Sequence, residues 1–279
     1  MRSSRSAPPH WLMAVLMLCL SALLVGYFTR FDPGLQPAQA AAPTPTAEST
    51  PAPTPVPTPT PEPTPEPTPE PDWSQPVPEG KAVDPEEWFA DAVFIGDSRT
   101  DGLKLYSGIT SQAAFLDYTG ITVYDVLNGK TVIRSGDKKI SILDALAQHT
   151  YGKVYISLGV NELGYYDAEG FAETYAQIID AIRDCQPEAL VYVQSIIPVN
   201  TAKCKANQAP YYVTNEGIAS YNEALAAMCA EKEVRLIAVD QALVDEEGQV
   251  PSHLSADGVH FKKEGYTIWL DYLSTHTGT

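Results

Sequence analysis

Apolar residues are distributed very unevenly along this chain, and their pattern divides it into three segments. Residues 11–28 form one uninterrupted, uncharged apolar run, WLMAVLMLCLSALLVGYF. Residues 43–78 consist mainly of Pro, Thr and Glu and contain few large apolar side chains. From about residue 82 onwards, short apolar stretches alternate with longer amphipathic ones. We therefore expect three unlike segments, which comprise residues 1–30, 31–81 and 82–279.

The first segment has the length and polarity of a membrane-spanning helix. As a helix, residues 11–28 would extend about 27 Å, which is close to the thickness of the hydrocarbon core of a bilayer. Arg2 and Arg5 precede the run, and basic residues favour the cytoplasmic side of a membrane. We therefore expect a single-pass signal anchor in the cell membrane, which contacts the lipid bilayer through residues 11–28 and leaves the rest of the chain outside. The alternative is a secreted protein, cleaved near Ala40 after the small-x-small sequence Ala38-Gln39-Ala40.

The second segment predicts an extended linker. Fifteen of the 24 prolines lie in residues 43–78, and a Pro-Thr-Pro-Glu unit is repeated three times from Pro59 to Glu70. Proline fixes φ and removes a backbone donor, so neither helix nor sheet can form in such a segment. We expect a disordered, Pro-rich stalk with polyproline II character, at about 3.1 Å per residue. Residues 43–78 would then form a semi-rigid spacer on the order of 100 Å long, within an extended linker that comprises residues 31–81.

The third segment alternates predicted strands with predicted helices. Short apolar stretches predict buried strands at residues 92–95, 153–158, 190–195 and 234–239. Amphipathic stretches predict helices at residues 140–148, 168–185, 217–231 and 262–274. This alternation is typical of an α/β fold with a central parallel sheet and helices on both faces. Such sheets place their active sites at the carboxyl ends of the strands, so polar residues that follow the strands are the candidates for chemistry.

Polar residues follow the first two predicted strands and precede the last predicted helix. Ser98, in Gly96-Asp97-Ser98, would begin a helix, where free N–H groups and the helix dipole favour negative charge. Asn161 could direct its side-chain amide at a substrate oxygen. Asp257 precedes His260 by three residues, a spacing at which a carboxylate can fix the tautomer of an imidazole. Taken singly, each motif has a structural alternative, namely a helix N-cap, an Asn turn and a loop Asp that caps a helix.

The charge and the cysteine content exclude several function classes. The chain has 18 Lys and Arg against 35 Asp and Glu, a net charge of −17, and it stays acidic without its linker. Such a surface repels phosphates, so we expect no nucleic-acid partner. The four cysteines include no C-x-x-C pair that would suggest structural zinc. Three of them, Cys185, Cys204 and Cys229, follow the membrane segment, and an odd number leaves one thiol free or in an intermolecular bond.

In combination, these motifs resemble the GDSL/SGNH hydrolase family over nearly all of residues 82–279. The matching positions, in family order, are Gly96-Asp97-Ser98 for the first block, Gly120 for the second, Asn161 for the third, and Asp257 with His260 for the last. Two residues depart from the family pattern. Arg99 stands where the family has Leu, and Glu162 stands where the third block usually has Asp.

The resemblance implies a flavodoxin-like α/β/α sandwich, the SGNH hydrolase fold, and the hydrolysis of acyl esters by a serine esterase. In the implied mechanism, Ser98 attacks the ester carbonyl, His260 accepts its proton and Asp257 orients His260. The backbone N–H groups of Ser98 and Gly120 and the side chain of Asn161 would hold the oxyanion. The resemblance implies no metal and no organic cofactor.

Several assignments stay open at the level of the sequence. Asp240 is an alternative orienting carboxylate, and His253 is an alternative base. Residues expected at the rim of the substrate site are Arg99, Glu162, Tyr165 and Tyr211.

An exported esterase would meet cell-envelope or environmental polysaccharide, so removal of O-acetyl groups from acylated carbohydrate, or from another small ester, is the expected reaction. An O-acetyltransferase with the same triad and a non-catalytic carbohydrate-binding domain are the alternatives.

Overall fold

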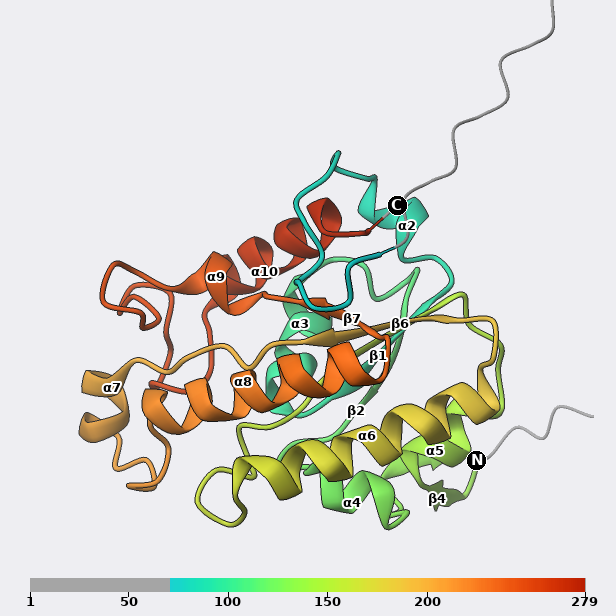
Figure 1. Ribbon diagram of the computed structural model, residues 1–279, viewed down its shortest axis with the longest axis horizontal. Helices are drawn as coiled ribbons and strands as arrows, with labels where there is room; N and C mark the ends of the chain where they lie inside the picture. Colours follow the sequence, from blue (N-terminus) through green and yellow to red (C-terminus); the bar gives the residue numbers. More distant parts are fainter. Residues whose placement is uncertain (1–70, 279) are drawn as a thin grey trace, which may run out of the picture. The chain divides into compact units, whose positions relative to one another are not determined.

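The computed structural model describes residues 71–278, which lie within the second of two units of the chain, Glu66–Thr279 (Figure 1). The expected membrane span at residues 11–28 and most of the expected linker lie outside the described residues. Among residues 71–278, no helix is both long and apolar enough to cross a bilayer.

A sheet of five parallel strands forms the centre of the described unit, in the order β2-β1-β5-β6-β7. The strands are β1 (Ala92–Gly96), β2 (Ala114–Asp117), β5 (Lys153–Ser157), β6 (Leu190–Gln194) and β7 (Arg235–Ile237). Counted within the sheet alone, this order is 2-1-3-4-5, the order of flavodoxin-like sheets. The predicted α/β fold with a central parallel sheet is therefore confirmed. The sequence pattern missed β2, because it is short and only Leu116 in it is buried.

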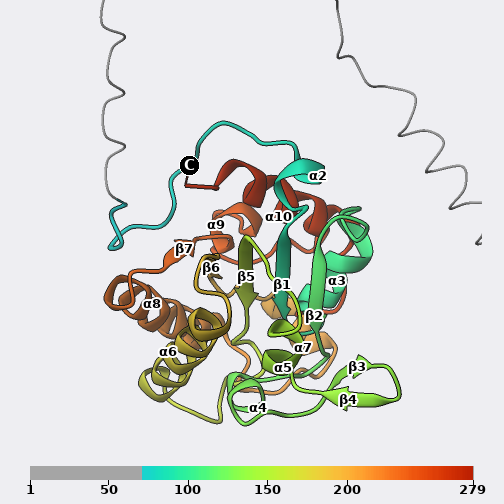
Figure 2. The ribbon, with the colours of Figure 1, turned by 90° about the vertical axis from the view of Figure 1, so that its right-hand side faces the viewer.

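Helices cover both faces of this sheet (Figure 2). The helices on one face are α4 (Val123–Leu127), α5 (Ile142–Leu146), α6 (Ala168–Cys185) and α8 (Asn215–Glu231). Those on the other face are α2 (Pro85–Trp88), α3 (Ser98–Tyr106), α9 (Asp240–Leu243) and α10 (Lys263–Thr275). The short helix α7 (Thr201–Ala206) follows β6. The result is a three-layer arrangement in which each helix layer buries its own apolar cluster against the sheet.

Alternation along the strands supplies both clusters. In β1, Val93 and Ile95 join the cluster under α6 and α8, whereas Ala92 and Phe94 join the cluster under α10. Successive side chains of a strand point to opposite faces. Because both faces are covered, such strands are continuous apolar runs and show no polar alternation.

An aromatic ladder crosses the sheet on the α10 side. Its four rings, on neighbouring strands in register, are Phe115, Phe94, Tyr155 and Tyr192. Their successive ring centroids are 5.0, 4.9 and 4.6 Å apart. The Trp88 indole N–H donates to the Tyr155 hydroxyl at 2.9 Å, and the Tyr192 hydroxyl donates to the Thr277 carbonyl at 2.6 Å. Each aromatic pair adds about 0.5–1.5 kcal/mol beyond the burial of its area, so the ladder helps to fix the strand register.

Short polar side chains fix where the helices begin. Asp167 accepts a hydrogen bond from the Gly170 N–H at the start of α6, at 2.8 Å. Thr214 caps α8 in the same way, and Thr122 forms a capping box with Asp125 at α4. These oxygens satisfy N–H groups that have no partner within the helix.

A small antiparallel hairpin separates α4 from α5 and stands apart from the main sheet (Figure 2). It consists of β3 (Ile133–Ser135) and β4 (Lys138–Ile140), with Ile133 opposite Ile140. The helix expected at 140–148 is accordingly shorter, because β4 includes Ile140 and Ser141 caps the first turn of α5.

The folded unit begins earlier than the expected boundary at residue 82. Val77 is only 8% exposed, and its N–H donates to the Leu236 carbonyl of β7 at 2.7 Å. The Arg235 guanidinium lies over the Trp73 ring, 5.6 Å from its centroid. Residues 71–81 therefore cover the β7 edge of the sheet, where backbone groups would otherwise lack partners. Proline is compatible with an extended segment at a sheet edge, which is why a Pro-rich sequence can still pack here.

We predict that a chain starting at Lys81 is less stable than a chain starting at Pro71. Without Val77 the apolar surface of β7 is exposed and the Leu236 carbonyl loses its donor. Burying a valine contributes about 1.5–3 kcal/mol and a hydrogen bond about 1 kcal/mol, so the expected loss is about 2–4 kcal/mol. Urea unfolding of the two purified chains measures the difference.

The matched control for this truncation is Val77→Ser in the chain that starts at Pro71. It removes the buried side chain and keeps the backbone hydrogen bond to Leu236, so its stability should lie between those of the two parent chains. Identical unfolding midpoints for all three chains would show that residues 71–80 contribute nothing to the fold.

Candidate active site

Ser98 is placed at the carboxyl end of β1 by the shortest possible connection to a helix. β1 ends at Gly96, Asp97 caps α3 by accepting a hydrogen bond from the Arg99 N–H at 2.8 Å, and Ser98 is the first helical residue. A side chain at Gly96 would lie 2.6 Å from the Ser157 carbonyl oxygen of β5, so only glycine fits at this point. The serine hydroxyl is thereby held at a helix N-terminus, where developing negative charge is favoured.

A chain of two hydrogen bonds joins Ser98, His260 and Asp257. The Ser98 Oγ lies 2.8 Å from His260 Nε2, and His260 Nδ1 lies 2.7 Å from Asp257 Oδ2. The other oxygen of Asp257 accepts the N–H groups of Val259 and His260 at 2.9 and 2.8 Å. The structure therefore brings together three residues that are expected to form a triad, although 162 positions separate Ser98 from His260.

The carboxylate of Asp257 is stabilised in its charged form. Partial burial raises its pKa, but the hydrogen bonds from the His260 backbone, the His260 ring and the Val259 N–H outweigh this effect, and the pKa of Asp257 is lowered. The side chains of His260 and Asp257 remain 40% and 47% exposed, so water reaches both of them.

The loop that carries Asp257 and His260 is held by the segment around α7. Asn200 N–H donates to the Gly258 carbonyl at 2.8 Å, and the Asn207 side-chain amide donates to the Asp257 carbonyl at 3.0 Å. Gly258 has φ of 113° and packs so closely on Cys204 that a Cβ would lie 2.5 Å from its backbone nitrogen. Sequence patterns carry no signal for these contacts, because the two segments are about 50 residues apart.

Arg99 was expected at the rim of the substrate site, and the structure corrects this expectation. Arg99 is buried, with 3% of its surface exposed. Its Nε donates to the Val259 carbonyl at 3.0 Å, and its Nη1 donates to the Ile197 carbonyl at 2.6 Å. The guanidinium also lies over the Phe261 ring, with Cζ 5.1 Å from the centroid. Arg99 therefore ties the start of α3 to the residue that precedes His260.

The buried guanidinium of Arg99 keeps one polar atom without a partner among residues 71–278, namely Nη2. A cavity of about 10 Å³, lined by Arg99 and Asp97, lies in this region. This volume is about what a single water molecule needs. Burial lowers the pKa of Arg99, and the nearby carboxylate of Asp97 opposes this effect.

Asp97 is a buried carboxylate that the sequence identified only as part of the first motif. It is 2% exposed, and its Oδ2 accepts a hydrogen bond from the Asn161 side-chain amide at 3.1 Å. Burial raises the pKa of Asp97, whereas the charge of Arg99 lowers it. Asp97 thus links the end of β1 to the residues that follow β5.

Asn161 reaches the expected location but has two partners there. Its Nδ2 donates to Asp97 Oδ2 and to the Ile121 carbonyl, each at 3.1 Å. These two bonds use both amide protons, so one of them has to be released if Asn161 is to donate to a substrate oxygen.

The backbone offers two other donors for an oxyanion. The N–H groups of Ser98 and Gly120 make no hydrogen bond among residues 71–278. Ser98 N–H belongs to the unsatisfied first turn of α3. Gly120 has φ of 75° with open space around its Cα, a conformation that suits glycine. These two N–H groups match the expected oxyanion donors.

Glu162 was also expected at the rim, and the structure places it in the interior instead. It is 1% exposed, and its Oε1 accepts a hydrogen bond from the Val123 N–H at 2.5 Å, at the start of α4. Its Oε2 has no partner among residues 71–278. Burial, together with the charge of Asp97, raises the pKa of Glu162 to about 8. Glu162 is therefore a neutral carboxylic acid at pH 7 that fastens the Asn161 segment to α4.

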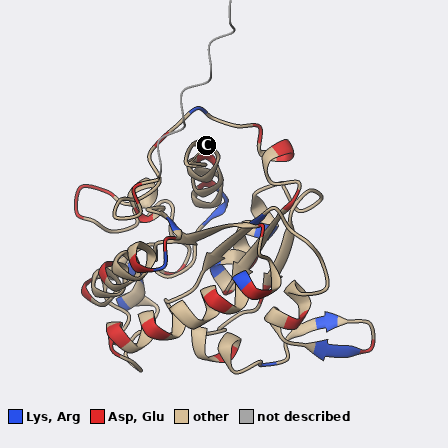
Figure 3. Ribbon diagram, turned by 45° about the vertical axis from the view of Figure 1, so that its right-hand side comes forward, with Lys and Arg blue, Asp and Glu red and all other residues tan. Residues whose placement is uncertain are grey.

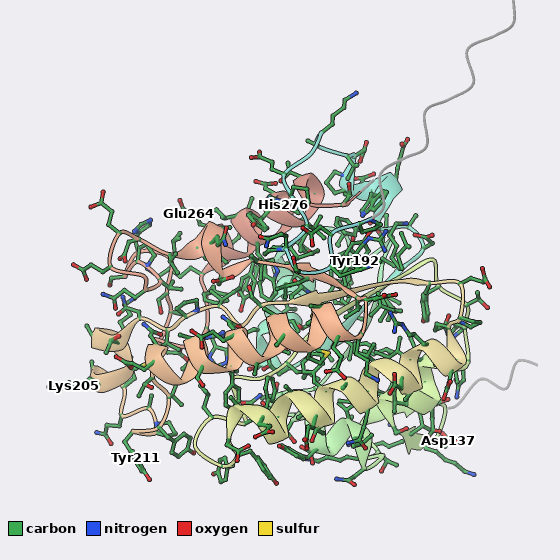
Figure 4. The ribbon with its side chains drawn as sticks, viewed as in Figure 1. Asp137, Tyr192, Lys205, Tyr211, Glu264 and His276 are labelled. Atoms are coloured by element: carbon green, nitrogen blue, oxygen red, sulfur yellow. The ribbon has the colours of Figure 1, made fainter. Side chains whose placement is uncertain are left out.

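The two expected rim tyrosines are exposed. Tyr165 is 69% exposed and Tyr211 is 92% exposed. Tyr212 connects them, because its hydroxyl lies 3.2 Å from that of Tyr165 and its ring centroid lies 5.4 Å from each of the other two rings. Tyr165 lies on the segment that follows Asn161, and Figure 4 labels Tyr211 at the same end of the molecule as Lys205 of α7.

The alternative acid and base lie elsewhere. Asp240 accepts a hydrogen bond from the Ser195 hydroxyl, and the Asp240 N–H donates back to that oxygen at 3.0 Å. His253 is an exposed residue on the loop before Ser255, and the Ser98 hydroxyl pairs with His260. The geometry therefore favours Asp257 over Asp240 as the partner of His260.

We predict that Glu162→Gln stabilises the protein increasingly as the pH rises. A glutamate in water has a pKa of 4.5, whereas burial raises the pKa of Glu162 to about 8 in the folded protein, so between these values the folded state holds a proton that the unfolded state releases. The contribution of this proton to the free energy of unfolding is fully present below pH 4.5 and is lost as the pH rises through about 8. The glutamine keeps the acceptor for Val123 without this loss, and the gain in unfolding free energy should reach on the order of 5 kcal/mol at pH 8.5. Unfolding free energies from pH 5 to 8.5 measure it.

The control variant for this pH series is Glu173→Gln, at an exposed position of α6. Its stability should follow that of the parent chain at every pH. If Glu162→Gln also follows the parent chain, Glu162 does not carry a raised pKa.

Comparison with known proteins places this chain in a family. Residues 94–268 match the sequence profile of the GDSL-like Lipase/Acylhydrolase family. The isoamyl acetate-hydrolyzing esterase of Saccharomyces cerevisiae is 40% identical over 63 residues, a match that covers 23% of this chain and 26% of the esterase. This chain thus matches about a quarter of the length of that curated relative.

Solved structures share the fold. A protein from Streptococcus pneumonia, provisionally described as a platelet activating factor, superimposes with a TM-score of 0.54 at 24% identity, over 66% of this chain and 81% of that chain. A GDSL-like lipase from Bacteroides thetaiotaomicron gives a TM-score of 0.50 at 18% identity, over 67% and 87% of the two chains. The family profile covers more than half of the chain, including Ser98 and His260. The expected enzyme class, a GDSL-type acylhydrolase or esterase, is thereby confirmed, and the chain belongs to the GDSL-like lipase/acylhydrolase family.

Proposed function

We propose that this protein is an extracytoplasmic serine esterase that removes acetyl groups from acylated carbohydrate through an acyl-enzyme. The observation that carries the proposal is the hydrogen-bond chain from Ser98 Oγ to His260 Nε2, at 2.8 Å, and from His260 Nδ1 to Asp257 Oδ2, at 2.7 Å. This geometry provides a nucleophile, a base within reach of its proton, and a carboxylate that fixes the tautomer of the base.

In the first half of the reaction, His260 Nε2 takes the hydroxyl proton of Ser98 while Oγ bonds to the ester carbonyl carbon. The imidazolium then donates this proton to the alcohol oxygen of the ester as the carbon–oxygen bond breaks. The alcohol leaves and the acyl group stays on Ser98. Asp257 remains ionised throughout, which agrees with its lowered pKa, and it stabilises the positive charge on His260.

In the second half, His260 takes a proton from a water molecule as the water oxygen attacks the acyl carbon. The proton returns to Ser98 Oγ when the carboxylic acid leaves. The oxyanion that forms in each half is held by the free N–H groups of Ser98 and Gly120, to which Asn161 contributes by exchanging one of its present partners. The exposure of His260 gives water direct access to the base, which favours hydrolysis over acyl transfer.

The nature of the ester is inferred from three observations. The yeast relative is named for the hydrolysis of an acetate ester, which supports acetate as the acyl group. The exposed rings of Tyr165 and Tyr211, with the partly buried Tyr212 between them, offer flat apolar faces with hydroxyl rims, which suit the faces of sugar rings. Residues 11–28, an uncharged apolar run, support export with a retained anchor or with cleavage near Ala40.

We predict that Ser98→Ala retains the fold and abolishes ester hydrolysis. Loss of the nucleophile in a triad lowers kcat by about 10⁴-fold or more. Release of acetate from acetylated xylan and turnover of a chromogenic acetyl ester measure the activity, and the melting temperature reports the fold. Ser111→Ala, at an exposed serine of the same domain, is the control and should leave both activities unchanged. Retention of activity in a well-folded Ser98→Ala variant would contradict the proposal.

A further inference from the structure

The β3–β4 hairpin concentrates positive charge on an otherwise acidic protein. Residues 82–279 contain 14 Lys and Arg against 28 Asp and Glu. Four of the 14 lie within ten residues, at Lys130, Arg134, Lys138 and Lys139, and Asp137 at the tip is the only acidic residue among residues 130–140. The hairpin segment thus carries a net charge of +3, four positive minus one negative. Figure 3 shows both strands of the hairpin in the colour of Lys and Arg, next to helices that are marked mainly by Asp and Glu.

The arrangement of these cations on the hairpin is unfavourable by itself. Arg134 on β3 lies directly opposite Lys139 on β4, and Lys138 is opposite Ser135. Side chains directly opposite in an antiparallel pair have Cβ atoms about 4.5–5.5 Å apart, and like charges at this distance destabilise the pair.

The three hairpin cations have no compensating partner within the described part of the chain. Lys130 is paired with Asp125 at 3.1 Å, whereas Arg134, Lys138 and Lys139 take part in no ion pair among residues 71–278. All three are exposed.

The alternation of the hairpin places two of its cations, Arg134 and Lys139, on an outward face. Ile133 and Ile140, which are register partners, are partly buried against the core. The next pair along the ribbon, Arg134 with Lys139, therefore points to the opposite face, which is solvent. Lys138 shares the face of Ile140 but is exposed, next to the turn of the hairpin. The hairpin is held by its isoleucines and presents a narrow cationic ribbon on its free side and beside its turn.

We propose that this ribbon binds an anionic glycan, a linear sugar chain that bears carboxylate groups. The proposal rests on the geometry of the hairpin and does not require the proposed esterase activity. The negative charge of the rest of the domain would repel such a polymer, and the ribbon supplies a local attractive site for it. A linear chain can lie along a ribbon two strands wide without approaching the acidic helices.

A flat anionic membrane fits the same ribbon less well. Asp125 of α4 and Asp144 of α5 flank the hairpin in the sequence, and a planar surface that met these two helices would meet their acidic side chains. The hairpin also carries no exposed large apolar side chain among the described residues, although peripheral membrane segments combine basic residues with such side chains.

The ribbon is remote from the tyrosines near the candidate active site. In Figure 4, Asp137 at the hairpin tip and Tyr211 lie at opposite ends of the molecule. Binding at the ribbon would hold a polymer at the end of the molecule opposite Tyr211, so it is expected to change the apparent affinity for polymers and to leave the turnover of small esters unaltered.

The test compares the full chain with Arg134→Gln/Lys138→Gln/Lys139→Gln in binding to polygalacturonate, an unacetylated acidic glycan. We expect a dissociation constant about tenfold weaker for the triple variant, since three exposed charge contacts are lost. The binding of the parent chain should also weaken as salt is raised from 20 to 300 mM. Isothermal titration calorimetry measures both effects.

The control removes three exposed charges at another place, with Lys205→Gln/Lys262→Gln/Lys263→Gln. It has the same net charge as the hairpin variant and should bind polygalacturonate as the parent chain does. Equal weakening in both variants would overturn the proposal, because net charge alone would then explain the binding. Equally strong binding of the parent chain to a neutral galactan would also overturn it.

Two further measurements separate this proposal from its alternatives. Sedimentation with vesicles that contain phosphatidylserine tests the membrane, and binding to these vesicles without binding to polygalacturonate would replace the glycan by a lipid surface. Turnover of a chromogenic acetyl ester should be equal in the parent chain and the hairpin variant. A hairpin variant that loses this turnover together with glycan binding would contradict a separate binding surface, whereas failure of the esterase in the parent chain would leave the binding result intact.

Discussion

The burial of the Asp97 carboxylate at the end of β1 is the constraint on which the site depends. A charged group that is 2% exposed has to be compensated, and here the Arg99 N–H and the Asn161 amide supply its hydrogen bonds. The first bond caps α3 and sets the position of Ser98. The second fixes the segment after β5 against the end of β1. One side chain thus connects the nucleophile with the segment that is proposed to hold the oxyanion.

Two buried ionisable residues extend this connection to the other loops. Arg99 binds the carbonyl of Val259, directly before His260, and Glu162 binds the N–H of Val123 at the start of α4. If either side chain moved out to water, its buried backbone partner, the Val259 carbonyl or the Val123 N–H, would lose a hydrogen bond. The loops at the carboxyl ends of the strands are therefore held relative to one another. The candidate triad is therefore assembled from distant segments and yet remains partly exposed to solvent.

The sequence predicted the parallel sheet and the motif residues, because Ser98 and Asn161 directly follow apolar strands. It misplaced Arg99 and Glu162, since charged residues usually lie at the surface, and their partners are 160 and 39 residues away. It also ended the linker too late. Val77 lies in a Pro-rich stretch, and only the long-range hydrogen bond to Leu236 shows that this stretch packs against the sheet.

The most direct test of the central claim, that Ser98 is activated by His260, is covalent labelling with a fluorophosphonate followed by peptide mass spectrometry. We expect one adduct per chain, located on Ser98, and labelling slowed by orders of magnitude in His260→Ala, because the hydroxyl at 2.8 Å from Nε2 then loses its base. An adduct on another serine, or an unchanged rate in His260→Ala, would contradict it.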